Sequence, residues 1–209
     1  FPGIELHLIE GNSSELANDL LHGTIDLMID LLPFTAENVD TVPICQEEIL
    51  LVVPDEVLKK AHPDGWDELR KKMEQGADVR LLENCPFVLL NKGNRVRTIA
   101  DEIFEDAQVT PHIALETENI ETALALSVKG MGITFYPRMF MSPDHAANTN
   151  KNPLTHQTGL NLYPLNYSRA HGTLGLGYHK GHYMSRATHE FIRIALERIP
   201  YVAKDAECD

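Results

Sequence analysis

The chain has 209 residues, of which 43% are hydrophobic and 23% are charged, as in a globular protein that can bury one good core or two small ones. Its 31 acidic residues outnumber 18 basic ones, and a net charge of −13 argues against a surface of this chain that binds DNA. No apolar run approaches the roughly 18 residues that a membrane span needs.

Two features of the sequence bear on its context. The three cysteines are too few and too scattered for a disulfide framework, and an odd number fits a reducing compartment. The chain starts abruptly at Phe1 without a Met or a signal-peptide pattern, so we expect a fragment of a longer protein.

The first part of the chain predicts alternating strands and a helix. Ile4–Glu10 alternates apolar and polar residues, as a half-buried strand does. Asn12 followed by Glu15 resembles a capping box that opens a helix ending near His22. Further along, the sequence predicts a buried strand at Ile25–Ile29, a loop at Leu31–Val42 and a buried strand at Glu48–Pro54.

The middle of the chain predicts two further helices separated by a buried strand. Asp64–Met73 is amphipathic and suits a surface helix. Val96–Ala107 repeats apolar residues at helical spacing after the turn Asn91–Asn94. The strands expected around this helix are Pro86–Leu90 and His112–Glu116.

The stretch Leu115–Pro137 combines a strand, a turn, a helix and another strand. Asn119 suits the helix N-cap, and Gly130 supplies a left-handed residue past the helix end. Gly132 then turns the chain back into an apolar strand. One such strand–helix–strand unit implies a parallel sheet with helices on its faces. The helix has a mostly apolar stripe of Ile120, Ala123, Leu124, Ser127 and Val128.

After Pro137 the sequence predicts a polar loop at Ser142–Gln157, strands at Leu160–Pro164 and Thr173–Tyr178, and a last helix capped by Ser185. The tail from Tyr201 onward is expected to fray.

Three strand-to-helix turns carry polar side chains: Glu10–Ser13, Asn91–Thr98 and Thr117–Ile120. Ligands of open α/β sheets bind outside the carboxyl ends of the strands, where helix N-termini present free N–H groups. The alternative interpretation is that the Asn and Ser residues only cap helices and the arginines are solvated. The candidate ligand-binding residues in these turns are Asn12, Ser13, Asn94, Arg95, Arg97, Thr98, Thr117 and Asn119.

The sequence offers no catalytic constellation and no complete metal site. It lacks a nucleophile elbow, a Cys-x-x-Cys pair and a phosphate-binding glycine loop. His179 and His182 could supply two metal ligands, whereas a site needs three or four. We therefore expect no catalytic residue, no metal and no cofactor other than a small-molecule ligand.

Three segments together resemble the effector-binding (substrate-binding) domain of LysR-type transcriptional regulators. They are FPGIELHLIEGNSSELANDLLHGTIDLMI, NRVRTIADEIF and ETENIETALALSVKGMGITFYPR, and GTLGLGYHKGH with the last helix resembles the family's closing segment. The resemblance implies an α/β fold of the type II periplasmic-binding-protein kind, with two α/β subdomains and an effector in the cleft between them. The first subdomain would be residues 1–46 plus 179–209, and the second 47–178.

The resemblance also assigns effector contacts by position. In the first subdomain, Asn12, Ser13 and the loop Asp30–Leu32 would contact the effector, with Leu32 as the contact residue of that loop. Asn94, Arg95, Val96, Arg97 and Thr98 would contribute from the second, together with the turn that carries Thr117 and Asn119.

The chain departs from the family pattern in two ways. One strand and helix that usually precede the FPGIEL segment are missing, as is the N-terminal winged-helix DNA-binding domain, so another chain could complete the pocket. Acidic Asp30 stands where some members that bind aromatic acids have a basic residue, which disfavours an anionic effector, whereas Arg95 and Arg97 favour one.

We therefore expect the ligand-sensing and oligomerisation domain of a cytoplasmic bacterial regulator that contacts DNA only through the absent domain and does not contact membranes. It would form a homodimer by packing helix Ser13–His22 against helix Ile120–Lys129 of a partner, and a tetramer at full length. The alternatives are an extracytoplasmic solute-binding protein of the same fold, which predicts a signal peptide upstream, and an enzyme such as a dehydratase.

Overall fold

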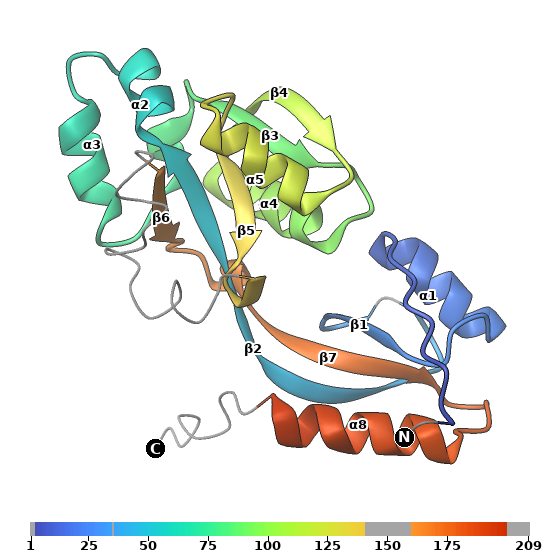
Figure 1. The fold of residues 1–209 in the computed structure, drawn as a ribbon. Helices are drawn as coiled ribbons and strands as arrows, with labels where there is room; N and C mark the ends of the chain where they lie inside the picture. Colours follow the sequence, from blue (N-terminus) through green and yellow to red (C-terminus); the bar gives the residue numbers. More distant parts are fainter. Residues whose placement is uncertain (1–2, 35, 141–159, 200–209) are drawn as a thin grey trace. The chain divides into compact units, whose positions relative to one another are not determined.

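The computed structural model describes residues 3–34, 36–140 and 160–199. The predicted loop at Ser142–Gln157 and the tail lie outside the described residues. In chain order, the elements are α1 (Ser13–His22), β1 (Met28–Leu31), β2 (Val39–Pro54), α2 (Asp55–Ala61), α3 (Trp66–Met73), the 3₁₀ turn η1 (Val79–Leu82), β3 (Pro86–Leu90), α4 (Arg95–Ala107), β4 (His112–Thr117), α5 (Ile120–Val128), β5 (Thr134–Pro137), η2 (Arg138–Phe140), β6 (Leu160–Pro164), η3 (Ser168–Ala170), β7 (His171–His179) and α8 (Arg186–Arg198) (Figure 1).

The chain divides into two compact units. The first unit comprises Phe1–Glu47 and Gly172–Asp209, and the second comprises Glu48–His171.

In the first unit, β7 lies between β1 and the N-terminal part of β2. Strands β1 and β7 pair antiparallel. Helix α1 covers β1 through Ala17 and Leu20, which form a buried cluster with Met28. Helix α8 begins as predicted, because the Oγ of Ser185 accepts a hydrogen bond from the N–H of Thr188 at 3.1 Å.

The predicted strand at Ile4–Glu10 is wrong. The segment has no strand structure, and its Leu6 and Leu8 side chains are 75% and 84% exposed. A strand is stable only when a neighbour satisfies its backbone N–H and C=O groups, and none of the strands in the described ranges pairs with this segment. Alternation of apolar and polar residues is compatible with a strand, but a strand also needs a neighbour to pair with.

In the second unit, the C-terminal part of β2 lies between β5 and β6 and pairs antiparallel with both. Strands β3 and β4 pair in parallel, and Ile133, just before β5, forms a parallel bridge with Phe87 of β3. The parallel arrangement predicted from Leu115–Pro137 is therefore confirmed. Phe87 also contacts Phe104 of α4 and Phe135 of β5, with ring centroids 5.0 and 6.3 Å apart, at the centre of the core.

Helix α5 confirms the features expected of its sequence. Asn119 caps it, since its Oδ1 accepts from the N–H of Thr122 at 3.0 Å. Gly130 has a φ of 74°, the left-handed conformation expected past the helix end. At Gly132 a Cβ would lie 2.8 Å from the carbonyl oxygen of Pro86, so only glycine fits this close approach. The apolar stripe packs, through Ile120, Leu124 and Val128, on the cluster of Val52, Tyr136, Leu160 and Leu162.

Three element predictions need correction. The strand expected at Ile25–Ile29 lies at Met28–Leu31, and β2 begins already at Val39, inside the predicted loop. Helix α2 was not predicted, because it follows β2 directly at Pro54 and no side chain caps it.

None of the helices in the described ranges is both long and apolar enough to cross a bilayer.

Candidate functional site

Two of the three predicted turns meet in the second unit. Leu90 and Thr117 are the last paired residues of the parallel strands β3 and β4. The N–H of Asn91 donates to the carbonyl oxygen of Thr117 at 2.8 Å, which joins the turns directly. Figure 1 shows β3 and β4 side by side, and α4 and α5 start within a few residues of their ends. We call residues 91–98 and 117–120 the strand-end edge.

The N-terminus of α4 forms one part of this edge. The Oδ1 of Asn94 accepts from the N–H of Val96 at 2.9 Å, and its carbonyl oxygen accepts from the Thr98 hydroxyl at 3.2 Å. The side chain of Val96 is buried. The Nε of Arg95 is buried without a hydrogen-bond partner among the described residues. Capping thus explains Asn94, whereas Arg95 retains an unsatisfied donor.

The N-terminus of α5 forms the other part. Thr117 Oγ1 accepts a long hydrogen bond from the N–H of Asn119 at 3.4 Å, and Asn119 caps the helix. The first N–H groups of a helix lack partners within the helix, and the helix dipole makes this end attractive to negative charge. Two such ends at one edge favour a ligand that offers hydrogen-bond acceptors.

Arg97 has a different environment from the one its position in the turn suggested. Its side chain is only 4% exposed, and a guanidinium N–H donates to the carbonyl oxygen of Leu90 at 2.7 Å. It also forms ion pairs with Asp101, at 2.8 Å, and with Glu116. The guanidinium therefore ties α4 to the ends of β3 and β4 and is occupied by partners within the chain. A contact between Arg97 and an effector stays a prediction.

No pattern in the sequence indicates that Glu116 belongs to this arrangement. Glu116 alternates with apolar residues along β4, as any solvent-facing strand residue does, and lies 19 positions from Arg97. Only the pairing of β3 with β4 brings the two together.

The remaining predicted residues lie in the first unit. Asn12 caps α1, with its Oδ1 accepting from the N–H of Glu15 at 2.9 Å, and Ser13 is the first residue of that helix. Leu32 directly follows β1, and its N–H donates to the carbonyl oxygen of Thr173 at 2.8 Å. The side chain of Leu32 lies over Gly175 of β7, where a Cβ would meet it at 2.8 Å. These residues thus lie at the start of α1 and just past β1.

Neither metal nor thiol chemistry is suggested by the described residues. Across residues 3–34, 36–140 and 160–199, no three His, Cys, Asp or Glu side chains gather as metal ligands. The His179 and His182 rings stack with centroids 4.0 Å apart, and His179 Nδ1 accepts from the Gly181 N–H at 3.0 Å. Burial raises the pKa of the Cys85 thiol to about 11, which disfavours the reactive thiolate.

Comparison with known proteins places this arrangement in a family. The model of the LysR substrate binding domain matches residues 1–200. A curated relative, the "Uncharacterized HTH-type transcriptional regulator YcgK" of Bacillus subtilis (strain 168), is 28% identical over 145 residues, which cover 66% of this chain and 45% of that protein. The chain spans about half the length of the curated relatives it matches.

Solved structures of low sequence identity share the fold. The Synechocystis PCC6803 CcmR regulatory domain in complex with 2-PG has a TM-score of 0.71 at 16% identity, covering 97% of this chain and 88% of that one. The effector binding domain of QuiR in complex with shikimate has a TM-score of 0.67 at 19% identity, covering 90% of this chain and 78% of that one. The fold is that of LysR effector-binding domains, of the type II periplasmic-binding-protein kind, as predicted. With the family model matching nearly the whole sequence, the chain belongs to the LysR substrate-binding domain family.

Proposed function

We propose that this chain is the effector-sensing domain of a bacterial LysR-type transcriptional regulator and that its effector contacts the strand-end edge. The observation that carries the proposal is the hydrogen bond between Asn91 and Thr117, which brings the N-termini of α4 and α5 to one edge. The family match and the name of YcgK as a transcriptional regulator support the regulatory role over solute binding outside the cytoplasm.

The chemistry of the edge suggests the kind of effector. Helix N-termini offer donors, and the unsatisfied Nε of Arg95 adds another. The Thr98 hydroxyl donates its hydrogen to the Asn94 carbonyl oxygen, so its oxygen remains as an acceptor for a ligand. Arg97 is already paired with two carboxylates, so its positive charge is balanced within the chain. A ligand of the strand-end edge therefore does not need a full negative charge. We therefore expect a small polar molecule with several acceptors, such as a hydroxylated or carboxylated metabolite. Asn12, Ser13 and Leu32 are proposed to add contacts from the first unit.

The effector acts, in this proposal, by shifting a population of conformations. A ligand that binds one conformation of the domain more tightly increases its share, and it can shift the equilibrium only by its difference in affinity. No chemical transformation of the ligand is needed, so we do not propose an enzyme.

The proposed partners follow from charge and from the helix surfaces. With a net charge of −13, the chain is a poor DNA-binding surface, so DNA contact is assigned to another domain of the regulator, which acts in the cytoplasm. Helices α1 and α5 each bury a single face, through Ala17 and Leu20 and through Ala123 and Ser127 respectively. We propose that their outer faces pair in a homodimer, and that two dimers form a tetramer at full length.

A metabolite titration of the full-length regulator that contains this chain tests the proposal. Binding to its promoter DNA and transcription from that promoter are measured while small polar metabolites are added one at a time. At least one metabolite is expected to change both readouts and to be recovered unchanged by mass spectrometry. If no metabolite alters DNA binding or transcription, or if the active compound is consumed, the sensing role is refuted.

A further inference from the structure

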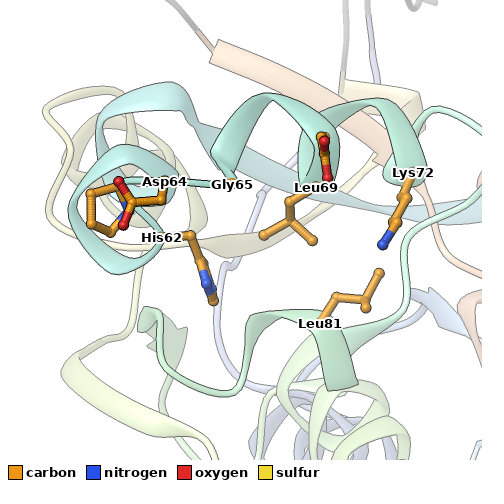
Figure 2. A pocket seen from close by; sticks show the side chains of 8 residues that line it. His62, Asp64, Gly65, Leu69, Lys72 and Leu81 are labelled. Atoms are coloured by element: carbon orange, nitrogen blue, oxygen red, sulfur yellow. The ribbon is translucent and has the colours of Figure 1, made fainter.

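A pocket of about 420 Å³ lies in the second unit on elements that do not form the strand-end edge (Figure 2). It is open to solvent and is bordered by the connection between α2 and α3, helix α3 and the turn η1. Its volume lies in the range of roughly 300–1,000 Å³ that is usual for small-molecule sites. The lining residues are His62, Pro63, Asp64, Gly65, Glu68, Leu69, Lys72 and Leu81.

The wall formed by α2, α3 and their connection is held by local contacts. The N–H of His62 donates to the carbonyl oxygen of Leu58 at 2.7 Å, and the N–H of Gly65 donates to that of His62 at 3.2 Å. The Lys59 ammonium lies 4.4 Å from the centre of the Trp66 ring, a cation–π contact that links α2 to α3. Contacts within the chain therefore hold this wall in place.

The opposite wall, η1, is fixed by Asp78. The side chain of Asp78 accepts from the N–H of Arg80 at 3.0 Å and from the Tyr167 hydroxyl at 2.7 Å. The N–H of Leu81 donates to the carbonyl oxygen of Asp78 at 3.0 Å, so the position of Leu81 follows from the same anchor.

The cations of α3 differ in their partners. Arg70 and Lys71 both pair with Asp67, at 3.1 and 2.7 Å. Lys72 has no ion pair within the described part of the chain, and Figure 2 shows it extending from α3 toward Leu81. Lys72 is thus a cation available to a bound carboxylate.

The other lining groups complete a mixed surface. In Figure 2, Leu69 and Leu81 extend into the space from opposite walls and form an apolar middle. Asp64 and Glu68 are the two acidic lining residues. The Nε2 of His62 is buried and lacks a hydrogen-bond partner among the described residues.

We propose that this pocket binds a zwitterionic amino acid with an apolar side chain. Lys72 takes its carboxylate, Glu68 takes its ammonium group, and Leu69 and Leu81 hold its side chain. A ligand with only a negative charge would be repelled by the two acidic lining residues and would leave them unpaired. A ligand with only a positive charge would be repelled by Lys72 and would leave it unpaired. The zwitterion is the class that matches both signs and the apolar middle. The site is separate from the strand-end edge and does not depend on the effector proposed for it.

Isothermal titration calorimetry on the full chain with L-leucine and L-phenylalanine tests the assignment. We expect a Kd of about 1 mM or tighter for at least one of them. 4-Methylpentanoate, which lacks the amino group, isopentylamine, which lacks the carboxylate, and glycine, which lacks the side chain, should each bind about tenfold more weakly or not at all.

Matched variants locate the binding. Lys72→Gln and Glu68→Gln should each weaken it about tenfold, whereas Lys71→Gln, whose lysine pairs with Asp67, should leave it unchanged. Thermal unfolding checks that each variant folds. Absence of heat with either amino acid at about 10 mM, equal binding of the analogues, or full binding by Lys72→Gln overturns the inference. Loss of binding in Thr98→Ala would place the amino acid at the strand-end edge, which overturns this site and leaves the proposed function standing.

Discussion

Replacing Arg97 by Met should destabilise the second unit strongly, because its guanidinium joins three elements. The variant leaves the carbonyl oxygen of Leu90, a residue only 3% exposed, without its donor, at a cost of about 1–3 kcal/mol. The carboxylates of Asp101 and Glu116 are each 46% exposed, so water partly replaces the lost ion pairs, and each adds about 0.5 kcal/mol. The free energy of unfolding should fall by about 2–4 kcal/mol.

The assay is urea unfolding followed by tryptophan fluorescence. Trp66 is the single tryptophan of the chain and lies in α3 of the same unit, so it reports on the unit that contains Arg97. With a slope of about 1–3 kcal/mol per molar urea, the unfolding midpoint should shift by roughly 1–2 M.

Arg169→Met is the matched control. Arg169 also forms two ion pairs with α4, to Glu102 and Asp106, but its side chain is 46% exposed. Its loss should cost less than about 1 kcal/mol. Equal losses of unfolding free energy in the two variants would refute the role of Arg97 in joining α4 to β3 and β4 and would indicate a solvated arginine.

Three further predictions concern single sites. Ser127→Ala should raise the melting temperature slightly, because the Ser127 hydroxyl is fully buried and has no hydrogen-bond partner among the described residues; a lower melting temperature would mean that the hydroxyl is satisfied. Gly132→Ala should cost about 2 kcal/mol or more in urea unfolding, because its Cβ would lie 2.8 Å from the carbonyl oxygen of Pro86, whereas Gly65→Ala, with open space around it, should be tolerated; similar losses for both would contradict the close approach. The arginine beside Asp78, helped by a tyrosine hydroxyl, lowers the pKa of the Asp78 carboxyl from 3.8 to about 2, so the ionised carboxylate stabilises the fold above about pH 4 and this stability is lost as the pH falls through about 2. Asp78→Asn should therefore remove up to about 2 kcal/mol of the difference in unfolding free energy between neutral and acid pH. A difference unchanged by the substitution would refute the pairing.

Local signals made the sequence informative about helices and turns. Asn119 was expected to cap α5, and capping was the alternative interpretation of Asn94; both side chains cap their helices, because a cap depends only on residues within the next turn. The parallel arrangement predicted from Leu115–Pro137 followed from its order of strand, helix and strand, and both β4 and Ile133 pair in parallel with β3.

Contacts distant in sequence could not be predicted in this way. An arginine in the first turn of a helix has the same local pattern whether it is solvated or buried, so the partners of Arg97 became evident only from the pairing of β3 with β4. The segment Ile4–Glu10 shows the same limit, since its alternation is local but its strand structure requires a neighbour.

The candidate site was predicted only in part. The sequence indicated which turns would carry polar side chains, and the structure shows that the two turns of the second unit are joined by a hydrogen bond. The sequence did not distinguish an arginine whose donors bind partners within the chain, such as Arg97, from an arginine with an unpaired donor, such as Arg95.

A dose–response measurement with Thr98 variants shows whether an effector contacts the strand-end edge. Transcription from the regulator's own promoter is measured against the concentration of the active metabolite, for the natural protein, Thr98→Ala and Thr98→Ser. If the effector contacts this edge, Thr98→Ala should shift the half-maximal concentration upward by about tenfold, whereas Thr98→Ser, which keeps the hydroxyl, should not. Superimposable curves for all three proteins, with unchanged thermal stability, would contradict it.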